Sequence, residues 1–384
     1  MKALGLSSLD YTCQRRMKMK SAVFVLLAGV ALASLVQGQG KGGPPAPPLM
    51  ECGVHGDIDI LCGTRSPEDL ELMPDGKSLL VSQFVNGPAG AGVAGLMVFD
   101  HAKRSFTKLT PTADPRKDWG DPACPGPIGD ALRPHGISLL KRNNGAIQVF
   151  VVNHGGRESI EMFELKQFGR TADLIWHGCV VSKEAFNDVA AEPDGGFIAT
   201  HPTALQPPAL PAGQGKGAPA FDLFSGQASG YVSRWIPGKG ESELPGTRAG
   251  YPNGVLVSSD GRYMYFNAWT AKEVHKYDLK EGKETGMVKL DFMPDNISWT
   301  SKKTMLAAGV KGARGNCPAS SSTPCIQAFG IAEIDPGKME AKTVFDSEGK
   351  GALIGGVSEA LQVGNSIYIG AFQGDRIVKI PVKK

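Results

Sequence analysis

The chain has 384 residues, enough for one large β-rich domain, and its 50 glycines and 27 prolines suit many turns and few long helices. Charged residues make up 21% of the chain and aromatic residues 7%, as in an ordinary soluble protein. Residues 1–39 carry a net charge of +4, so against the formal total of +3 the remainder carries −1. A nearly neutral body without a basic stripe argues against a nucleic-acid partner.

The N-terminal segment has the pattern of an export signal. Residues 15–20 are basic, and residues 21–36 form an apolar run that suits a signal peptide and is short for a membrane span. We predict that residues 1–38 are a signal peptide, or else an uncleaved anchor that associates with a membrane. Residues 39–50 are rich in Gly and Pro and are predicted to be a linker. A secreted or extracytoplasmic location follows from this pattern.

The rest of the chain, residues 51–384, repeats one pattern six times. Each copy has a polar start, an apolar run, a turn and a second apolar run, and in five of the six the turn contains Asp-Gly, Asn-Gly or Gly-Asn. The copies cover residues 67–82, 134–152, 187–199, 252–265, 294–307 and 357–370. A hairpin repeated at this spacing predicts an all-β, six-bladed β-propeller with four-stranded blades. Residues 376–382 are expected to complete a blade that begins near the N-terminus.

Polar residues stand just before the first strand of every copy. They are Glu68-Asp69, His135, Asn187-Asp188, Asn253, Asp295-Asn296 and Ser358-Glu359. In a propeller, equivalent positions at the start of the inner strands converge on the central channel. These residues, although distant in sequence, are therefore predicted to form one functional site.

The side-chain oxygens at these positions favour a hard cation. Calcium takes six to eight oxygen ligands in irregular geometry, whereas zinc prefers His or Cys. The predicted ligands of a catalytic calcium ion are Glu68, Asn187, Asn253, Asp295 and Asn296. A second, deeper calcium ion is predicted at Asp69 and Asp188 with the backbone carbonyl of Ile137. Taken singly, each Asn or Asp has the alternative role of capping a turn.

Two histidines extend the predicted site. His135 shares the position before the first strand, and His154 follows the next strand of the same blade. Neutral imidazole takes up a proton near working pH, so we predict a hydrolase in which His135 is the general base and His154 tunes or relays. The alternative is that His135 only makes a hydrogen bond across the channel. A G-x-S-x-G elbow, a P-loop and a dinucleotide fingerprint are all absent from the sequence.

Six cysteines follow the predicted signal, an even number that favours disulfides in an exported protein. Cys52 with Cys62 and Cys317 with Cys325 would close short loops, which leaves Cys124 with Cys179. Spacing alone leaves the connectivity open, and free buried thiols are the alternative.

In their order along the chain, these motifs resemble the paraoxonase/arylesterase family. The resemblance runs from about Cys52 to the C-terminus and is carried by PEDLELMPDGKSLLVS, RPHGISLL, VFVVNHGGRESIEMFEL, FNDVAAEPDG, PNGVLVSSDGRYMYFNAW and PDNISW. It implies a six-bladed propeller with two calcium ions and a lactonase activity, often with promiscuous arylesterase or organophosphate hydrolysis. It implies the same two ligand sets and the same histidine pair, and it adds Tyr251 and His201 as substrate-pocket residues.

The chain also departs from that family. Val310 stands where the family has a histidine, and residues 376–382 lack the cysteine of the family's long disulfide. The related gluconolactonase and senescence-marker propellers use a single metal held by similar residues. Our first hypothesis is therefore a secreted calcium-dependent lactonase or arylesterase acting on a small lactone or ester. The alternatives are a gluconolactonase-type sugar-lactone hydrolase and a non-catalytic binding propeller stabilised by calcium.

Overall fold

The computed structural model describes residues 48–85, 93–168, 171–205, 223–312 and 326–382. The predicted signal or anchor segment, most of the predicted linker, and Cys317 and Cys325 lie outside these ranges. No helix in the described part of the chain has the length and apolar character needed to cross a membrane.

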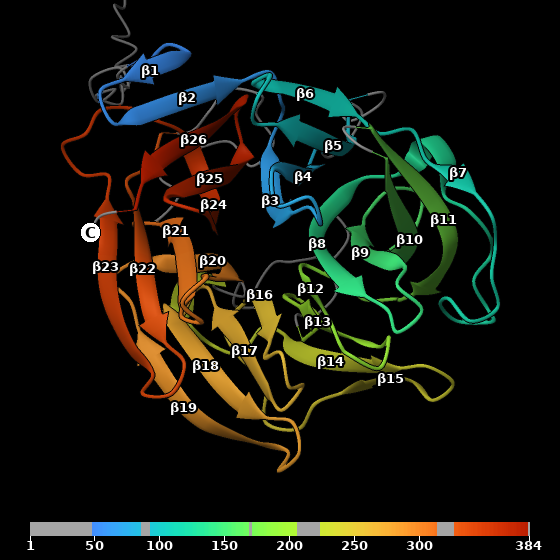
Figure 1. Ribbon diagram of the computed structural model, residues 1–384. Coiled ribbons are helices and arrows are strands. Elements are labelled where there is room, and N and C mark those ends of the chain that lie inside the picture. The colour runs from blue at the N-terminus through green and yellow to red at the C-terminus, as the bar shows by residue number, and fades with distance from the viewer. Residues whose placement is uncertain (1–47, 86–92, 169–170, 206–222, 313–325, 383–384) are drawn as a thin grey trace, which may run out of the picture. The chain divides into compact units, whose positions relative to one another are not determined.

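The strands form six sheets around a common centre, each with the first strand of its predicted repeat innermost (Figure 1). Blade 1 contains β3 (Pro67–Leu72), β4 (Ser78–Gln83), β5 (Gly95–Asp100) and β6 (Ser105–Lys108). Blade 2 contains β8 (Pro134–Lys141), β9 (Ile147–Asn153), β10 (Ser159–Phe168) and β11 (Thr171–Val181), with the short β7 (Thr112–Ala113) added in parallel to β11. Blade 3 contains β12 (Val189–Ala191), β13 (Phe197–His201), β14 (Tyr231–Ile236) and β15 (Gly240–Glu243).

Blade 4 contains β16 (Pro252–Val257), β17 (Tyr263–Ala268), β18 (Glu273–Asp278) and β19 (Lys283–Lys289). Blade 5 contains β20 (Met293–Trp299), β21 (Met305–Val310), β22 (Phe329–Asp335) and β23 (Glu340–Asp346). Blade 6 contains β24 (Gly355–Val363), β25 (Ser366–Gln373), β26 (Arg376–Pro381), β2 (Ile58–Cys62) and β1 (Gly53–His55). Two short 3-10 helices, η2 (Gly129–Ala131) and η3 (Leu223–Ser225), lie in loops. The predicted six-bladed, all-β propeller is confirmed.

Each predicted repeat is the inner hairpin of one blade. The copy at residues 67–82 forms β3 and β4, and the copy at residues 252–265 forms β16 and the start of β17. The Asp-Gly turns have the expected backbone, with Gly76 at φ 64° and Gly261 at φ 69°. Glycine adopts this left-handed region without the steric penalty of a Cβ atom, so the turn residues fix the register of these hairpins.

The last blade is closed by strands from both ends of the described chain. β26 pairs antiparallel with β25 on one side and with β2 on the other, and Ile60 lies opposite Val378. The disulfide Cys52–Cys62 then joins the residue before β1 to the end of β2. This confirms the predicted closure and the local cysteine pair, and closing so short a loop stabilises the fold by about 2–3 kcal/mol.

The second described disulfide, Cys124–Cys179, is also confirmed. It fastens the long loop between β7 and β8 to β11. The backbone of the same loop also donates from Asp114 to the carbonyl of Trp176, at an N–O distance of 2.9 Å. The loop is thereby held against the outer strand of blade 2.

Apolar side chains fill the interfaces between neighbouring blades. Between blades 6 and 1, for example, Leu79 and Phe99 pack against Leu361 and Ile377. Burying such surface stabilises the fold by about 25 cal/mol per Å² of apolar area. The starts of the inner strands, in contrast, carry buried polar residues such as Glu68 and Asn253. These buried polar residues form the candidate functional site.

Candidate functional site at the starts of the inner strands

The polar residues predicted from the six repeats occupy one structural position that recurs around the propeller. In β3, β8, β16, β20 and β24, the pairing with the following strand skips two residues near the start of the inner strand. The skipped residues are Glu68-Asp69, His135-Gly136, Asn253-Gly254, Asp295-Asn296 and Ser358-Glu359. In blade 3, Asn187-Asp188 directly precede β12. Such irregularities re-aim side chains away from the ladder, which frees these residues for contacts across the centre.

Contacts between blades bring these residues together. The Nδ2 of Asn296 donates to the Oε1 of Glu68 at 3.0 Å, although the two residues are 228 positions apart. The Nε2 of His135 lies 3.7 Å from the same oxygen of Glu68. The hydroxyl of Ser358 donates to the backbone carbonyl of Glu68 at 2.6 Å. Residues of blades 1, 2, 5 and 6 therefore meet at Glu68.

Two glycines let inner strands of neighbouring blades approach each other closely. A Cβ on Gly254 would lie 2.5 Å from the carbonyl oxygen of Asp295, and one on Gly136 would lie 2.6 Å from the Cα of Asp188. The backbone N–H of Gly136 also donates to the carbonyl of Asn187 at 3.3 Å. The sequences His-Gly and Asn-Gly in the repeats thus provide both a polar side chain and the space for the neighbouring blade.

Glu68, Asn187, Asn253, Asp295 and Asn296 are called the oxygen ring below. All five are buried. The Oε2 of Glu68 and the Oδ1 atoms of Asn187, Asn253 and Asn296 have no hydrogen-bond partner. A buried polar atom without a partner costs about 1–3 kcal/mol, so four such oxygens among five residues require an explanation. Carboxylate and amide oxygens are the donors that calcium prefers, and the ring fits that ion.

The ring differs from a site made of acidic and imidazole ligands. Within the described ranges, no group of three or more His, Cys, Asp or Glu side chains is arranged to hold a metal ion. A cation at the oxygen ring would therefore depend on the amide oxygens of its three asparagines. Oxygen-rich sets of this kind suit hard cations and not zinc.

Several buried carboxylates near the ring repel one another. Burial, and then the charges of Asp69, Asp295 and Asp188, raise the pKa of Glu68 well above its usual value. Burial raises the pKa of Asp69 to about 7. Burial, with the charge of Asp69 next, also raises the pKa of Asp188 and of Glu359. A cation at the ring would favour the ionised forms and oppose these shifts.

Asp69 and Asp188, called the Asp pair below, have oxygens that are already hydrogen-bonded. Asp69 accepts from the backbone N–H of Leu70 at 2.7 Å and of Ile137 at 2.6 Å. Asp188 accepts from the N–H of Val189 and of Val255, both at 2.7 Å. Each carboxylate therefore joins its own blade to the next one. The predicted carbonyl ligand, that of Ile137, belongs to the residue whose N–H Asp69 binds.

The two predicted histidines are in contact. The Nδ1 of His135 lies 2.9 Å from the Nε2 of His154, and the Nδ1 of His154 lies 2.8 Å from the Oε2 of Glu158. Burial, and then the charge of His154, lower the pKa of His135 well below its usual value, which keeps this imidazole neutral at neutral pH. The ring of Phe84 stacks on His135 with centroids 4.0 Å apart.

Sequence reasoning missed two residues at this site and gave a third no role. Glu158 follows His154 by four positions in the loop between β9 and β10, and Phe84 directly follows β4. Neither carries a motif, and only the fold places them at the histidines. Glu359 was visible as a repeat position without an assigned role. It is buried, and its Oε1 has no hydrogen-bond partner.

The side chains of the two residues predicted to line a substrate pocket have different partners. Tyr251, two residues before Asn253, packs its ring on Trp269 with centroids 5.3 Å apart. Trp269 forms one apolar cluster with Met293 and Val310, so Val310 lies in an apolar wall close to Tyr251.

The side chain of His201 contacts residues of blade 3. Its Nε2 lies 2.9 Å from the Oε1 of Glu241 on the outer strand β15, and its ring packs on Phe186 and Tyr231. These contacts lie within blade 3 and its flanking loop, and they do not join His201 to the oxygen ring.

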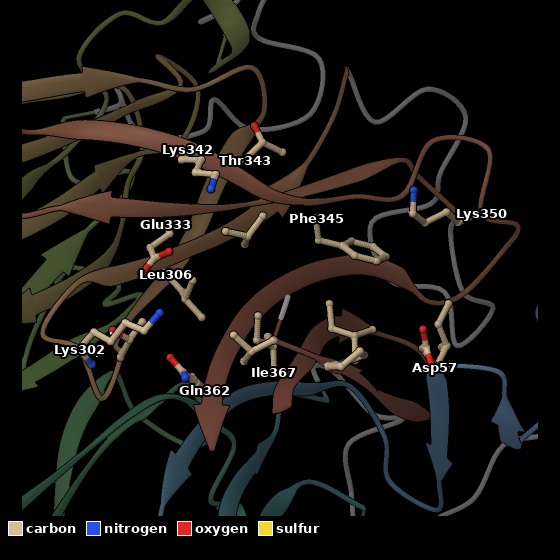
Figure 2. Close-up of a pocket in the computed structure, with 16 residues that line it drawn as sticks. Asp57, Lys302, Leu306, Glu333, Lys342, Thr343, Phe345, Lys350, Gln362 and Ile367 are labelled. Atoms are coloured by element: carbon tan, nitrogen blue, oxygen red, sulfur yellow. Dashed lines mark hydrogen bonds between the residues drawn. The ribbon is translucent and has the colours of Figure 1, made fainter. Parts of the chain in front are cut away.

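A cavity of about 580 Å³ lies between blades 5 and 6, away from the predicted site. Figure 2 shows Lys302, Lys342 and Lys350 around the apolar side chains of Leu306 and Phe345. None of the predicted site residues is among its lining residues. The cavity contains none of the buried oxygens without a partner, so we place the candidate site at the oxygen ring.

Known proteins resemble this chain in sequence. The model of the family described as SMP-30/Gluconolactonase/LRE-like region matches residues 94–296, more than half of the chain. Serum paraoxonase/arylesterase 1 of Rattus norvegicus is 25% identical over 240 residues, which are 60% of this chain and 62% of that protein. The human protein of the same name is 26% identical over 175 residues, 44% of this chain and 46% of its own length. The chain thus spans about three fifths, or less, of the curated relatives it matches.

Solved structures resemble it in fold. A luciferin-regenerating enzyme has a TM-score of 0.50 at 13% identity, and the match covers 84% of this chain and 94% of that one. A gluconolactonase of Xanthomonas campestris has a TM-score of 0.49 at 14% identity, covering 89% and 98%. At such identities the likeness to the first structure concerns the fold alone.

Proposed function

This chain belongs to the SMP-30/gluconolactonase/LRE-like family, and from that premise we propose that it is a calcium-dependent hydrolase of lactones that also accepts aryl esters. One observation carries the proposal. Four buried oxygens of the oxygen ring have no partner, and one ring residue, Glu68, lies 3.7 Å from the Nε2 of His135, an imidazole whose lowered pKa keeps it neutral. Such a set provides a place for a hard cation and a base for water in the same site.

The residues that would hold the catalytic calcium ion are Glu68, Asn187, Asn253, Asp295 and Asn296. When bound, the ion supplies Lewis-acid polarisation of the substrate carbonyl and stabilises negative charge on its oxygen. A second, structural ion would use the remaining lone pairs of the Asp pair together with the carbonyl of Ile137.

The chain's own residues account for the proton transfers. The Nε2 of His135 takes a proton from water, the water oxygen bonds to the carbonyl carbon, and the ring C–O bond of the lactone then breaks. The departing alkoxide oxygen takes up a proton, so one lactone and one water give one hydroxy acid. His154 stabilises the charged His135 through the contact at Nδ1. The apolar wall at Tyr251 and Trp269 would pack against the hydrocarbon part of the substrate.

A gluconolactonase-type sugar-lactone hydrolase with one metal ion is the second candidate. The hydrogen bonding of the Asp pair favours this candidate. Each of its four carboxylate oxygens already accepts a backbone N–H, so the pair does not require a second ion. Counting bound metal in the purified protein separates the two candidates: two ions per chain support the first, and one supports the second.

We further propose that the protein is secreted through residues 1–38. The two described disulfides, Cys52–Cys62 and Cys124–Cys179, support an oxidising compartment. Mass spectrometry of the protein recovered from its source tests this, since export predicts a mature chain without the signal.

The main experiment compares hydrolysis before and after chelation. The purified chain is assayed on alkyl lactones of increasing length, on gluconolactone and on phenyl acetate, then dialysed against EDTA and resupplied with Ca²⁺. We expect turnover to disappear with EDTA and to return with calcium. Full activity after prolonged dialysis would overturn the proposal. A large loss of thermal stability on chelation without turnover on any substrate would instead identify a binding propeller.

A further inference from the structure

We propose that Glu158 is a positioning residue that fixes the proton positions on both histidines, so that the free lone pair of His135 is at Nε2, on the side of the oxygen ring. This inference rests on the proposed function and deepens it. The paired histidines alone leave two proton arrangements open, and Glu158 selects one of them.

The three residues form a continuous row. The Oε2 of Glu158 lies 2.8 Å from the Nδ1 of His154, and the Nε2 of His154 lies 2.9 Å from the Nδ1 of His135. At the far end, the Nε2 of His135 lies 3.7 Å from the Oε1 of Glu68. Both short distances are those of hydrogen bonds, so each must contain one proton.

The chemistry of the Glu158 carboxylate determines which atom donates in each of the two hydrogen bonds. An ionised carboxylate only accepts hydrogen bonds, so the Nδ1 of His154 carries its proton. When His154 carries this single proton, its Nε2 is an acceptor, and the proton in the second hydrogen bond belongs to the Nδ1 of His135. Neutral His135 therefore has its lone pair at Nε2, where water at the oxygen ring can be deprotonated. The reverse arrangement would place a proton on Nε2 and remove the base.

The loop that carries His154 and Glu158 is held in place from both ends. The buried Asn153 donates from Nδ2 to the carbonyl of Gly155 at 3.0 Å and to that of Arg157 at 2.9 Å. The guanidinium of Arg157 binds the buried Glu161 at 2.9 and 3.0 Å. These bonds fix the backbone on both sides of the row. The side chain of Glu158 is therefore pre-positioned and keeps only 30% exposure.

A second pair in the molecule provides a matched control. On blade 4, the Oε2 of Glu284 lies 2.9 Å from the Nδ1 of His275, on the outer strands β19 and β18. The chemistry is the same as at Glu158, but the pair lies on an outer strand. A Glu–His contact that only adds surface stability should behave alike at both places.

The first test is kinetic, on the lactone that the wild type hydrolyses best, with saturating Ca²⁺. We expect Glu158→Ala to lower kcat about tenfold, with KM changed less than about twofold, because the partner of a functional histidine typically contributes 10- to 100-fold. Glu158→Gln keeps an acceptor oxygen and should recover kcat to within about threefold. Glu284→Ala should match the wild type. Equal kcat values for Glu158→Ala and Glu284→Ala would overturn the assignment.

The second test reads the protons directly. Imidazole ¹⁵N–¹H correlation spectra of ¹⁵N-histidine-labelled protein should show His154 protonated at Nδ1 in the wild type, and a mixture of tautomers in Glu158→Ala. Glu284→Ala should change only the signals of His275. A wild-type His154 protonated at Nε2 would refute the inference, whatever the kinetics show. If the wild type hydrolyses no lactone or ester, the proposed function fails, while this spectrum still decides the role of Glu158.

Discussion

Glu68 and Asn187 of the oxygen ring stand directly before Asp69 and Asp188 of the Asp pair, yet the hydrogen bonding of the two sets is opposite. Glu68 and Asn187 each present a buried oxygen without a partner, whereas the next residues, Asp69 and Asp188, accept backbone N–H groups with both oxygens. The difference separates two roles within one motif. The Asp pair joins neighbouring blades with or without a ligand, and the ring oxygens are left for something that the chain itself does not supply.

The largest loss of stability is expected when a residue of the Asp pair is replaced. Asp188→Ala leaves the N–H groups of Val189 and Val255 without their acceptor, which we expect to lower the free energy of unfolding by about 4 kcal/mol. The loss should be present in EDTA, because these bonds do not require metal. Denaturant titration of metal-free protein measures it. An Asp188→Ala variant as stable as the wild type in EDTA would mean that the carboxylate serves only a cation.

At the oxygen ring, we expect a substitution to lower activity strongly and stability only slightly. Asn253→Ala removes an oxygen that has no partner in the protein, so we expect the stability in EDTA to change by less than about 1 kcal/mol. Lactone hydrolysis with Ca²⁺ should fall about 100-fold, equivalent to about 2.7 kcal/mol in the barrier. Initial rates at saturating calcium test this. Wild-type rates in the variant would remove Asn253 from the site.

The buried carboxylates give the metal-free protein an unusual pH dependence. The pKa of Asp69 is raised to about 7 by burial, so between pH 4 and 7 the folded chain holds a proton that the unfolded chain has lost. Stability in EDTA should therefore fall as pH rises through this range, by about 1.4 kcal/mol per pH unit for each such group. Calcium should abolish the slope. Unfolding curves at pH 5, 6 and 7 provide the measurement, and a stability that rises with pH in EDTA would contradict the expectation.

The smallest combined effect on stability and calcium binding is expected at Ser358, through which blade 6 contacts the oxygen ring. The hydroxyl of Ser358 donates to the carbonyl of Glu68 at 2.6 Å, and Ser358 is fully buried. Ser358→Ala should cost about 1 kcal/mol of stability with little change in calcium affinity, because the ring oxygens stay in place. Calorimetric titration with Ca²⁺, alongside denaturation, distinguishes this from a direct ligand, whose loss would weaken binding strongly.

Much of this molecule follows from local sequence. The turn residues at Gly76 and Gly261 and the alternating apolar runs define six inner hairpins, because turn chemistry and the two-residue strand period act over short distances. The recurrence of polar residues before each first strand located the candidate site, since equivalent positions in repeats become neighbours in a propeller. The Cys52–Cys62 pair could be expected from spacing.

Only the tertiary structure decided which of these polar groups are already satisfied. Asn296 reaches Glu68 across 228 residues, and Asp69 finds the N–H of Ile137 on the next blade. The Nε2 of His201, a residue predicted for the substrate pocket, lies 2.9 Å from the Oε1 of Glu241 on an outer strand. Hydrogen-bond partners of this kind depend on how blades pack and where bulges turn a side chain. The sequence determined which residues reach the centre, and the packing of six blades determined which of their oxygens remain without a partner.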